Sequence, residues 1–173
     1  MSPDSEPLTL DGWAGPVRNA AWLHDDRLLV IACSDVKDLR VVDLRSGQTV
    51  KVLETAAALT DLQLREGVLT AAAGSEVLLW DAATFAPLAS HTLPFPVYTA
   101  ATCVSKKRFV VGGPDMWPRL YSADWVELET YKGHHGPVHS VAFHPSGESF
   151  ASGSEDGTIR LWSTEPAEVA ASS

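Results

Sequence analysis

The sequence predicts an all-β protein of four four-stranded antiparallel blades that form a partial propeller, an open arc, in preference to a closed four-blade ring. Two apolar landmarks recur along the chain with a period of about 40 residues. Within each period, short apolar runs alternate with turn-forming clusters, and almost nothing has a helical pattern. Four short strands in a period of this length are typical of propeller blades.

The first landmark is an apolar residue that opens a short run. The runs PVRNAAW, PVYTAAT and PVHSVAF align, and LTDLQL is a weaker fourth copy. The leading residues are separated by 42, 38 and 41 positions and are Val17, Leu59, Val97 and Val138. A second landmark follows 21 to 25 positions later, in the triplets that contain Val42, Trp80, Tyr121 and Trp162. Because two independent landmarks recur four times with a similar spacing, we interpret the chain as a repeat protein.

The landmarks divide the chain into repeats with a short segment at each end. We expect a flexible N-terminus at 1–7, repeats at 8–54, 55–92, 93–132 and 133–164, and a disordered tail at 165–173. The tail is small and polar, as fraying ends are. The start is acidic and lacks the apolar core of a secretion signal.

In each repeat, turn-forming residues separate short strand-like runs. In the last one, the runs VHSVAF, SFASG and TIRLW are separated by HPSGE and SEDG. Asp156-Gly157 is a strong hairpin signal, because glycine readily supplies the positive φ that such turns require. A fourth run follows the first three copies, as QTVKVLE, LASHTL and VELETY, but none follows Trp162. The segment PLTLDG (7–12) would supply that strand if the ring closes, and belongs to a preceding blade outside this chain if the arc is open.

The composition excludes several classes of partner. The net charge is -9 and the pI is about 5.0, so we expect no direct nucleic-acid binding. No apolar run approaches the roughly 18 residues of a membrane span, so we expect no membrane partner. The cysteines Cys33 and Cys103 match no zinc or redox spacing and lie in apolar stretches. We therefore expect buried reduced thiols, which fit a cytoplasmic location and also a nuclear one.

The last repeat carries a specific resemblance. Gly133-His134 opens it and SEDGTIRLW closes it, while a Trp-Asp pair survives at Trp80-Asp81. In these features the chain resembles the WD40 repeat family, over roughly residues 8–164 and most strongly in the final 36 of them. The resemblance implies that four side chains form a hydrogen-bonded tetrad that braces the blade: His134, Ser152, Asp156 and Trp162. The other copies lack the histidine, since Trp13, Thr55 and Leu93 stand in its place.

The chemistry of these groups supports bracing over catalysis. A carboxylate, an imidazole, a hydroxyl and an indole N–H can satisfy one another when they are buried. A hydrolase would need an exposed serine on a strained turn and an oxyanion donor pair, and neither is suggested. A zinc site would draw on His134, His135, His139 and His144, but neighbouring and odd-spaced residues of a strand point to opposite faces. We therefore expect no catalytic residue, no metal and no cofactor.

The resemblance also implies a partner-binding face. In WD40 proteins, partners bind the narrow face that is ringed by the loops entering the innermost strands and by the turn before the aspartate. The positions that match are Arg18, Thr60, Tyr98, Pro114, His139 and Glu155. Arginine and tyrosine are residue types that anchor interfaces well, although each position also fits an ordinary loop residue.

The resemblance implies a non-catalytic scaffold for protein–protein interaction. The segment 127–162 is similar to WD40 scaffolds that assist assembly of spliceosomal small nuclear ribonucleoproteins with the survival-of-motor-neuron complex, and that modulate receptor serine/threonine kinase signalling. A similar last blade occurs in the i subunit of translation initiation factor three, which is the alternative. A third class, a propeller enzyme with its active site in the central channel, would need acid/base or metal groups on the innermost strands, where VRNAAW and VHSVAF offer few.

Overall fold

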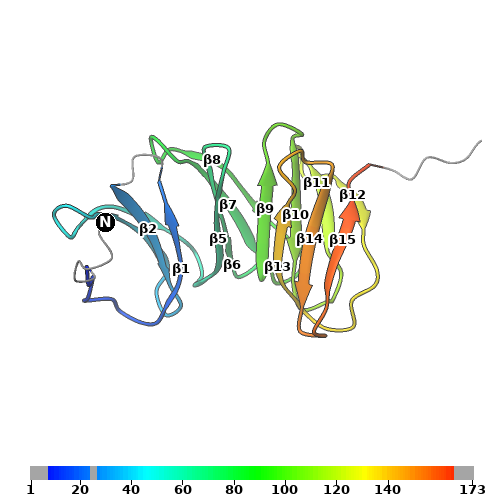
Figure 1. Ribbon diagram of the computed structural model, residues 1–173, viewed down its shortest axis with the longest axis horizontal. Helices are drawn as coiled ribbons and strands as arrows, with labels where there is room; N and C mark the ends of the chain where they lie inside the picture. The colour runs from blue at the N-terminus through cyan, green and yellow to red at the C-terminus, as the bar shows by residue number, and fades with distance from the viewer. Residues whose placement is uncertain (1–7, 24–26, 166–173) are drawn as a thin grey trace, which may run out of the picture.

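The computed structural model describes residues 8–23 and 27–165, and these form four antiparallel sheets without an α-helix (Figure 1). The all-β prediction is therefore confirmed over the described residues. The segments predicted to be flexible, 1–7 and 165–173, lie outside the description except for Glu165.

Each sheet is a meander of strands that are consecutive in sequence, and we number the sheets as blades in chain order. Blade 1 contains β1 (Val17–Trp22), β2 (Leu28–Cys33), β3 (Asp38–Asp43) and β4 (Gln48–Glu54). Blade 2 contains β5 (Leu59–Arg65), β6 (Val68–Ala73), β7 (Glu76–Asp81) and β8 (Pro87–Thr92). Blade 3 contains β9 (Thr99–Cys103), β10 (Arg108–Gly112), β11 (Arg119–Ser122) and β12 (Glu127–Thr130). Blade 4 has only three strands in the described chain, β13 (Val138–Phe143), β14 (Ser149–Ser154) and β15 (Ile159–Ser163).

The tight turns follow from local chemistry. At the β5–β6 hairpin, Glu66 and Gly67 have φ values of 50° and 76°. Two successive positive φ values match the twist of the flanking strands. At the predicted Asp156-Gly157 turn, Gly157 has a φ of 80° and its N–H donates to the Ser154 carbonyl at 3.1 Å.

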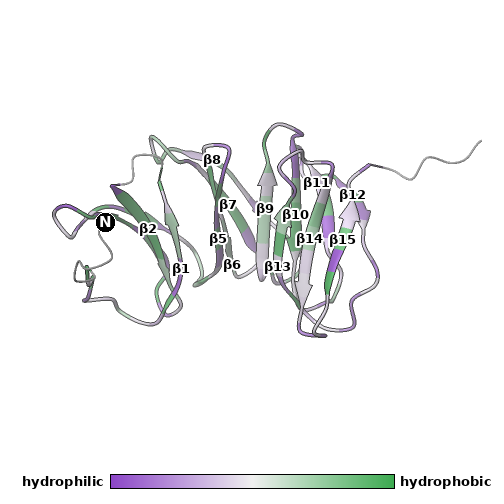
Figure 2. Ribbon diagram, viewed as in Figure 1, coloured by the Kyte–Doolittle hydropathy of each residue, from purple (hydrophilic) through white to green (hydrophobic). Residues whose placement is uncertain are grey.

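The core lies between blades, because both faces of an inner blade are covered by neighbours. All six residues of β6 are buried, which explains why its sequence VLTAAA, apolar except for Thr70, does not alternate between apolar and polar residues (Figure 2). Leu39 and Leu59 belong to the cluster between blades 1 and 2, and Val97 and Val111 to the cluster between blades 2 and 3. Val138 and Phe150 belong to the cluster between blades 3 and 4. Cys103 lies in this last cluster, and both cysteines are buried and free, as predicted.

The arc is open. Leu8–Leu10 form no ladder with β15, and blades 1 and 4 lie at opposite ends of the long axis of the molecule (Figure 1). Leu10 and Trp13 instead pack on the outer face of blade 1, against Ile31, Cys33 and Val42. The prediction of an open arc over a closed four-blade ring is confirmed.

A polar seam joins the innermost strands. The Asp61 carboxylate on β5 accepts hydrogen bonds from the Asn19 amide at 3.0 Å and from the Thr99 hydroxyl at 2.7 Å. Asn19 lies on β1 and Thr99 opens β9, so one carboxylate connects three blades. Further along β5, the Arg65 guanidinium donates to the carbonyls of Phe143, His144 and Pro145 at 2.7 to 2.9 Å. Together the two connections join the innermost strands of all four blades.

Candidate functional site

The structure brings the four tetrad residues together in blade 4. The Trp162 indole Nε1–H donates to the Ser152 hydroxyl oxygen at 2.7 Å. The His134 ring joins that hydroxyl through Nε2 at 2.7 Å and the Asp156 carboxylate through Nδ1 at 3.0 Å. Because the Asp156 carboxylate can only accept, the ring N–H is assigned to Nδ1, and Nε2 then accepts the proton of the Ser152 hydroxyl. His134 and Ser152 are buried, so the chain of bonds satisfies groups that have no access to water.

The Asp156 carboxylate is fully occupied in holding its turn. It accepts the backbone N–H groups of His135 and Thr158, each at 2.8 Å, and the Thr158 hydroxyl at 2.7 Å, in addition to His134. The His135 N–H first, then the Thr158 hydroxyl and N–H, hold the pKa of Asp156 well below its usual range. A carboxylate held in this way is a poor proton acceptor for catalysis, and the arrangement is that of a structural brace.

The first prediction concerns pH. Because the pKa of Asp156 is lower in the folded chain than in the unfolded chain, its stabilising contribution is fully present above pH about 4 and declines as the pH falls further. We expect Asp156→Asn to destabilise the chain at pH 7. The difference in urea midpoint between the unaltered chain and this variant should then become smaller as the pH falls from 4 to 2.5. Asp124→Asn, in the turn before β12, controls for the loss of an exposed charge. A gap that stays constant across this range would contradict the role of the carboxylate.

In the other blades, different residues occupy the positions of His134 and Asp156, and they make different contacts. Leu93 is buried in the cluster between blades 2 and 3. The Thr55 hydroxyl donates to the Ala57 carbonyl at 2.8 Å, and the Trp13 indole donates to the Leu10 carbonyl at 3.0 Å. In blade 3 the turn residue Asp115 pairs with Arg119, whose guanidinium lies 4.3 Å from the centre of the Phe95 ring. The other blades are therefore held here by apolar packing, by local hydrogen bonds or by an ion pair, and not by a histidine brace.

The six residues of the predicted binding face, which we call the loop face, lie where the chain enters the first strands or makes a turn. Three of them coincide with a break in strand register. Arg18, Thr60 and His139 each occupy the position skipped between Val17 and Asn19, between Leu59 and Asp61, and between Val138 and Ser140. A bulge of this kind redirects a side chain away from the regular alternation. The repeated bulge therefore redirects one residue in each of blades 1, 2 and 4.

Three residues of the loop face form one surface cluster. The rings of Tyr98 and His139 stack with centroids 5.4 Å apart and planes 10° apart. His139 Nε2 lies 3.2 Å from the Glu155 carboxylate, and both side chains are more than half exposed. The cluster offers a flat aromatic surface beside a negative charge at the junction of blades 3 and 4.

The other three residues of the loop face are placed less favourably for a partner. The Thr60 hydroxyl lies 3.0 Å from the Val97 carbonyl and 3.2 Å from the Ala72 carbonyl, so it is used within the fold. Pro114 is half-buried in the turn after β10, and Arg18 is exposed on β1, two blades away from Tyr98.

Sequence reasoning missed the polar seam. Asp61, Gln63 and Arg65 alternate with Leu62 and Leu64 along β5. This two-residue period was a readable signal of one polar and one apolar face. The run is a weak copy of the first landmark, which hides the pattern in an alignment of apolar positions.

The described residues give no support for metal chemistry or for a membrane-spanning helix. No group of three or more His, Cys, Asp or Glu side chains within 8–23 and 27–165 is arranged to hold a metal ion. Over the same ranges, no helix has the length and apolar character needed to cross a membrane.

Comparisons with known proteins agree with this geometry. The family described as WD domain, G-beta repeat matches residues 125–163. A Dictyostelium discoideum protein named serine-threonine kinase receptor-associated protein is 38% identical over 164 residues, which cover 92% of this chain and 55% of that protein. Eukaryotic translation initiation factor 3 subunit I of Drosophila grimshawi is 31% identical over 157 residues, which cover 78% of this chain and 47% of that subunit. The chain thus spans about half the length of these curated relatives.

Solved structures show the same architecture. The crystal structure of the computationally designed Ika4 protein superposes with a TM-score of 0.72 at 21% identity, covering 92% of this chain and 98% of that one. This likeness concerns the fold alone. The repeat match and the sequence relatives show that the chain is a member of the WD40 repeat family, homologous to proteins named serine-threonine kinase receptor-associated protein.

Proposed function

We propose that the chain is a non-catalytic protein-interaction scaffold whose partners bind at the loop face. The observation that carries the proposal is the Tyr98–His139 stack beside Glu155, in which the His139 and Glu155 side chains are more than half exposed, while the Ser-His-Asp groups of blade 4 are committed to the brace. Stacked aromatic rings supply contact area at little cost in side-chain entropy, and aromatic residues are frequent anchors of interfaces. A neighbouring carboxylate favours a partner with basic side chains.

For the biological partners, we propose components of the survival-of-motor-neuron complex during assembly of spliceosomal ribonucleoproteins, in the cytoplasm or nucleus. Receptor serine/threonine kinases are the second set, since the name of the relatives associates them with such receptors. The relatives are about twice as long as this chain, so both roles are proposals for it.

The alternative is a role in translation initiation. It is favoured by the 31% identity to the initiation factor subunit, over a smaller share of the chain than the first relative covers. The two functions share a fold and differ in partners, so only identification of the partners separates them.

The proposal is tested by affinity purification of the tagged chain with quantitative mass spectrometry. We expect ribonucleoprotein-assembly components, and we expect Tyr98→Ala and His139→Ala to reduce their recovery at least about 10-fold, the effect of losing an interface anchor. His144→Ala is the matched control, because His144 is an exposed histidine that immediately follows β13, the strand on which His139 lies. Recovery of initiation-factor subunits in their place would overturn the ribonucleoprotein-assembly role and support the role in translation initiation. Recovery of none of the three sets, or equal recovery with every variant, would overturn the proposal.

A further inference from the structure

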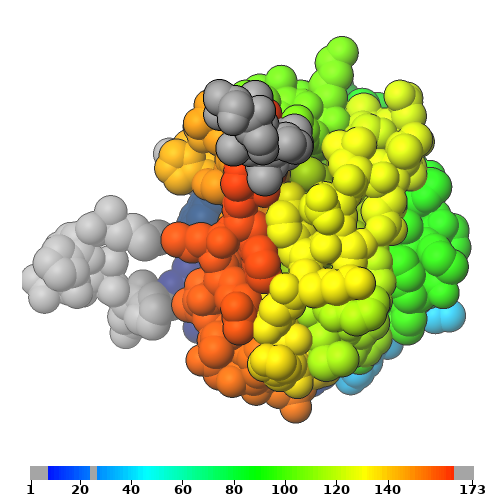
Figure 3. All heavy atoms as spheres, turned by 90° about the vertical axis from the view of Figure 1, so that its right-hand side faces the viewer, coloured from blue at the N-terminus to red at the C-terminus, as the bar shows by residue number. Residues whose placement is uncertain are grey.

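The two ends of the arc have complementary defects. Blade 4 stops at β15, so the strand has a neighbour on one side only in the described chain, whereas blades 1 to 3 each have a fourth strand. An edge strand offers unpaired N–H and C=O groups to any extended segment. Proteins protect such edges with outward charges, but here Ile159 and Leu161 are each 79% exposed. Figure 3 shows β15, in red, at the surface of this end of the molecule.

The opposite end carries a surplus segment. The fourth strands β4, β8 and β12 end five to eight residues before the first residues of β5, β9 and β13. Counting back the same distance from Val17, where β1 starts, reaches residues 9 to 12. Leu8–Gly12, which we call the N-terminal segment, thus holds the sequence position of a fourth strand that has no blade of its own among the described residues.

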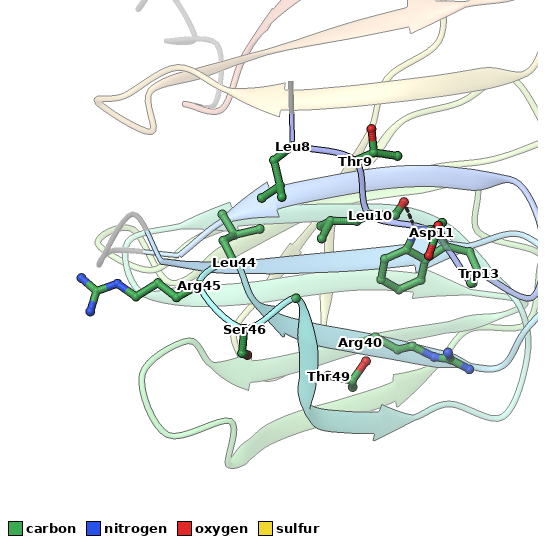
Figure 4. Close-up of a pocket in the computed structure, with 12 residues that line it drawn as sticks. Leu8, Thr9, Leu10, Asp11, Trp13, Arg40, Leu44, Arg45, Ser46 and Thr49 are labelled. Carbon is green, nitrogen blue, oxygen red and sulfur yellow. Dashed lines mark hydrogen bonds between the residues drawn. The ribbon is translucent and has the colours of Figure 1, made fainter. Parts of the chain in front are cut away.

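The packing of the N-terminal segment supports this assignment. Leu53 at the end of β4, Leu93 after β8 and Tyr131 after β12 each lie in the cluster that joins their blade to the next. Leu10 and Trp13 make the equivalent contact with the outer face of blade 1. Figure 4 shows Leu8, Thr9 and Leu10 running alongside blade 1, and Leu8 is 56% exposed. The segment lies where the fourth strand of a preceding blade would pack.

Charge adds a third argument. The Nε of Arg160 on β15 is buried and has no hydrogen-bond partner in the described residues. A buried unpaired donor is costly, so a partner group is expected beside it. The N-terminal segment carries the exposed carboxylate of Asp11, which has the chemistry to pair with a guanidinium.

We propose that the occupant of both ends is a second copy of this chain. The N-terminal segment of each copy adds to β15 of the other as its fourth strand, so that two arcs close into a ring of eight blades with two-fold symmetry. Main-chain hydrogen bonds provide the attraction, as in other cases of strand addition, and the two junctions are identical by symmetry. Blade 1 and blade 4 of one copy cannot meet in this way, because they lie at opposite ends of the arc (Figure 1). The proposal is independent of which partners bind the loop face.

The experiment measures the mass of the 173-residue chain by size-exclusion chromatography with light scattering, at concentrations from about 1 to 100 μM. We expect twice the chain mass of 18.6 kDa. Leu161→Asp places a charge on the junction, and the pair Leu8→Pro with Thr9→Pro removes two successive backbone donors from the N-terminal segment. Each should give the mass of a single chain. Leu88→Asp is the control, since Leu88 is 54% exposed on β8, away from both ends, and it should leave the doubled mass unchanged.

A mixing experiment distinguishes specific pairing of the two ends from non-specific association. A mixed pair of the Leu161→Asp chain and the double-proline chain retains one intact junction, whereas each variant alone retains none. We therefore expect the mixture to recover the doubled mass in part. A single-chain mass for the unaltered protein at every concentration would overturn the proposal, and so would a doubled mass that neither variant changes. The mass measurement does not depend on the partners that the affinity purification captures. If the second-copy proposal fails, the scaffold function is unaffected, and if the scaffold function fails, the second-copy proposal is unaffected.

Discussion

Replacing Ser152 with alanine is expected to lower the free energy of unfolding by about 2–4 kcal/mol, because the change leaves the buried His134 ring and the half-buried Trp162 indole without a hydrogen-bond partner. The hydroxyl of Ser152 accepts from the Trp162 indole and joins His134 Nε2, both at 2.7 Å. The His134 ring cannot turn to water, since it is almost completely buried, and the half-buried Trp162 indole packs against the cluster between blades 3 and 4. Urea unfolding monitored by tryptophan fluorescence measures the effect.

The control is Ser140→Ala, an exposed serine of the same sheet, for which we expect a change within about 0.5 kcal/mol. A double-mutant cycle with Trp162→Phe then isolates the bond between the serine and the indole. We expect a coupling of about 0.5–3 kcal/mol, as is usual for residues in one hydrogen-bond network. Independent, additive effects of the two changes would show that the tetrad does not act as a unit.

Replacing Phe150 with alanine is expected to cost about 3–5 kcal/mol, the range for removal of a buried aromatic side chain. Phe150 is 1% exposed, and its ring meets the edge of Tyr131 at a centroid distance of 4.9 Å. It also lies 6.1 Å from the ring of Phe143 and 6.4 Å from that of Trp162. The change opens a cavity between blades 3 and 4 that the rigid strands cannot close. Thermal and urea unfolding measure the loss.

The matched substitution is Leu88→Ala on the exposed side of β8, where we expect less than about 0.5 kcal/mol. Repeat proteins derive their stability from neighbouring units, so Phe150→Ala should also loosen blade 4 before the rest of the arc. Hydrogen exchange of the β14 and β15 amides reports this directly. Equal protection in all four blades of the variant would contradict a role at the interface of blades 3 and 4.

The position of the tetrad in the arc has a physical reason. Blade 4 has a packed neighbour on one face only in the described chain, and β15 leaves Ile159 and Leu161 in solvent. Blades 2 and 3 are covered on both faces and rely on apolar clusters, with Leu93 in the place of the histidine. A satisfied buried network therefore strengthens the blade in which apolar burial is smallest.

The sequence alone determined the repeat and the strands, because these depend on local signals, and its resemblance to WD40 repeats supplied the tetrad partners. The spacing of Val17, Leu59, Val97 and Val138 set the number of blades, and Asp156-Gly157 set a hairpin. Only the tertiary structure decided that the arc is open, that Asp61 and Arg65 connect strands from different blades, and that Tyr98 stacks on His139 while the Thr60 hydroxyl bonds main-chain carbonyls. These features depend on the angle between neighbouring sheets and on bulges that redirect single side chains. Both arise from contacts between residues that lie tens of positions apart, and a pattern read along the chain does not contain them.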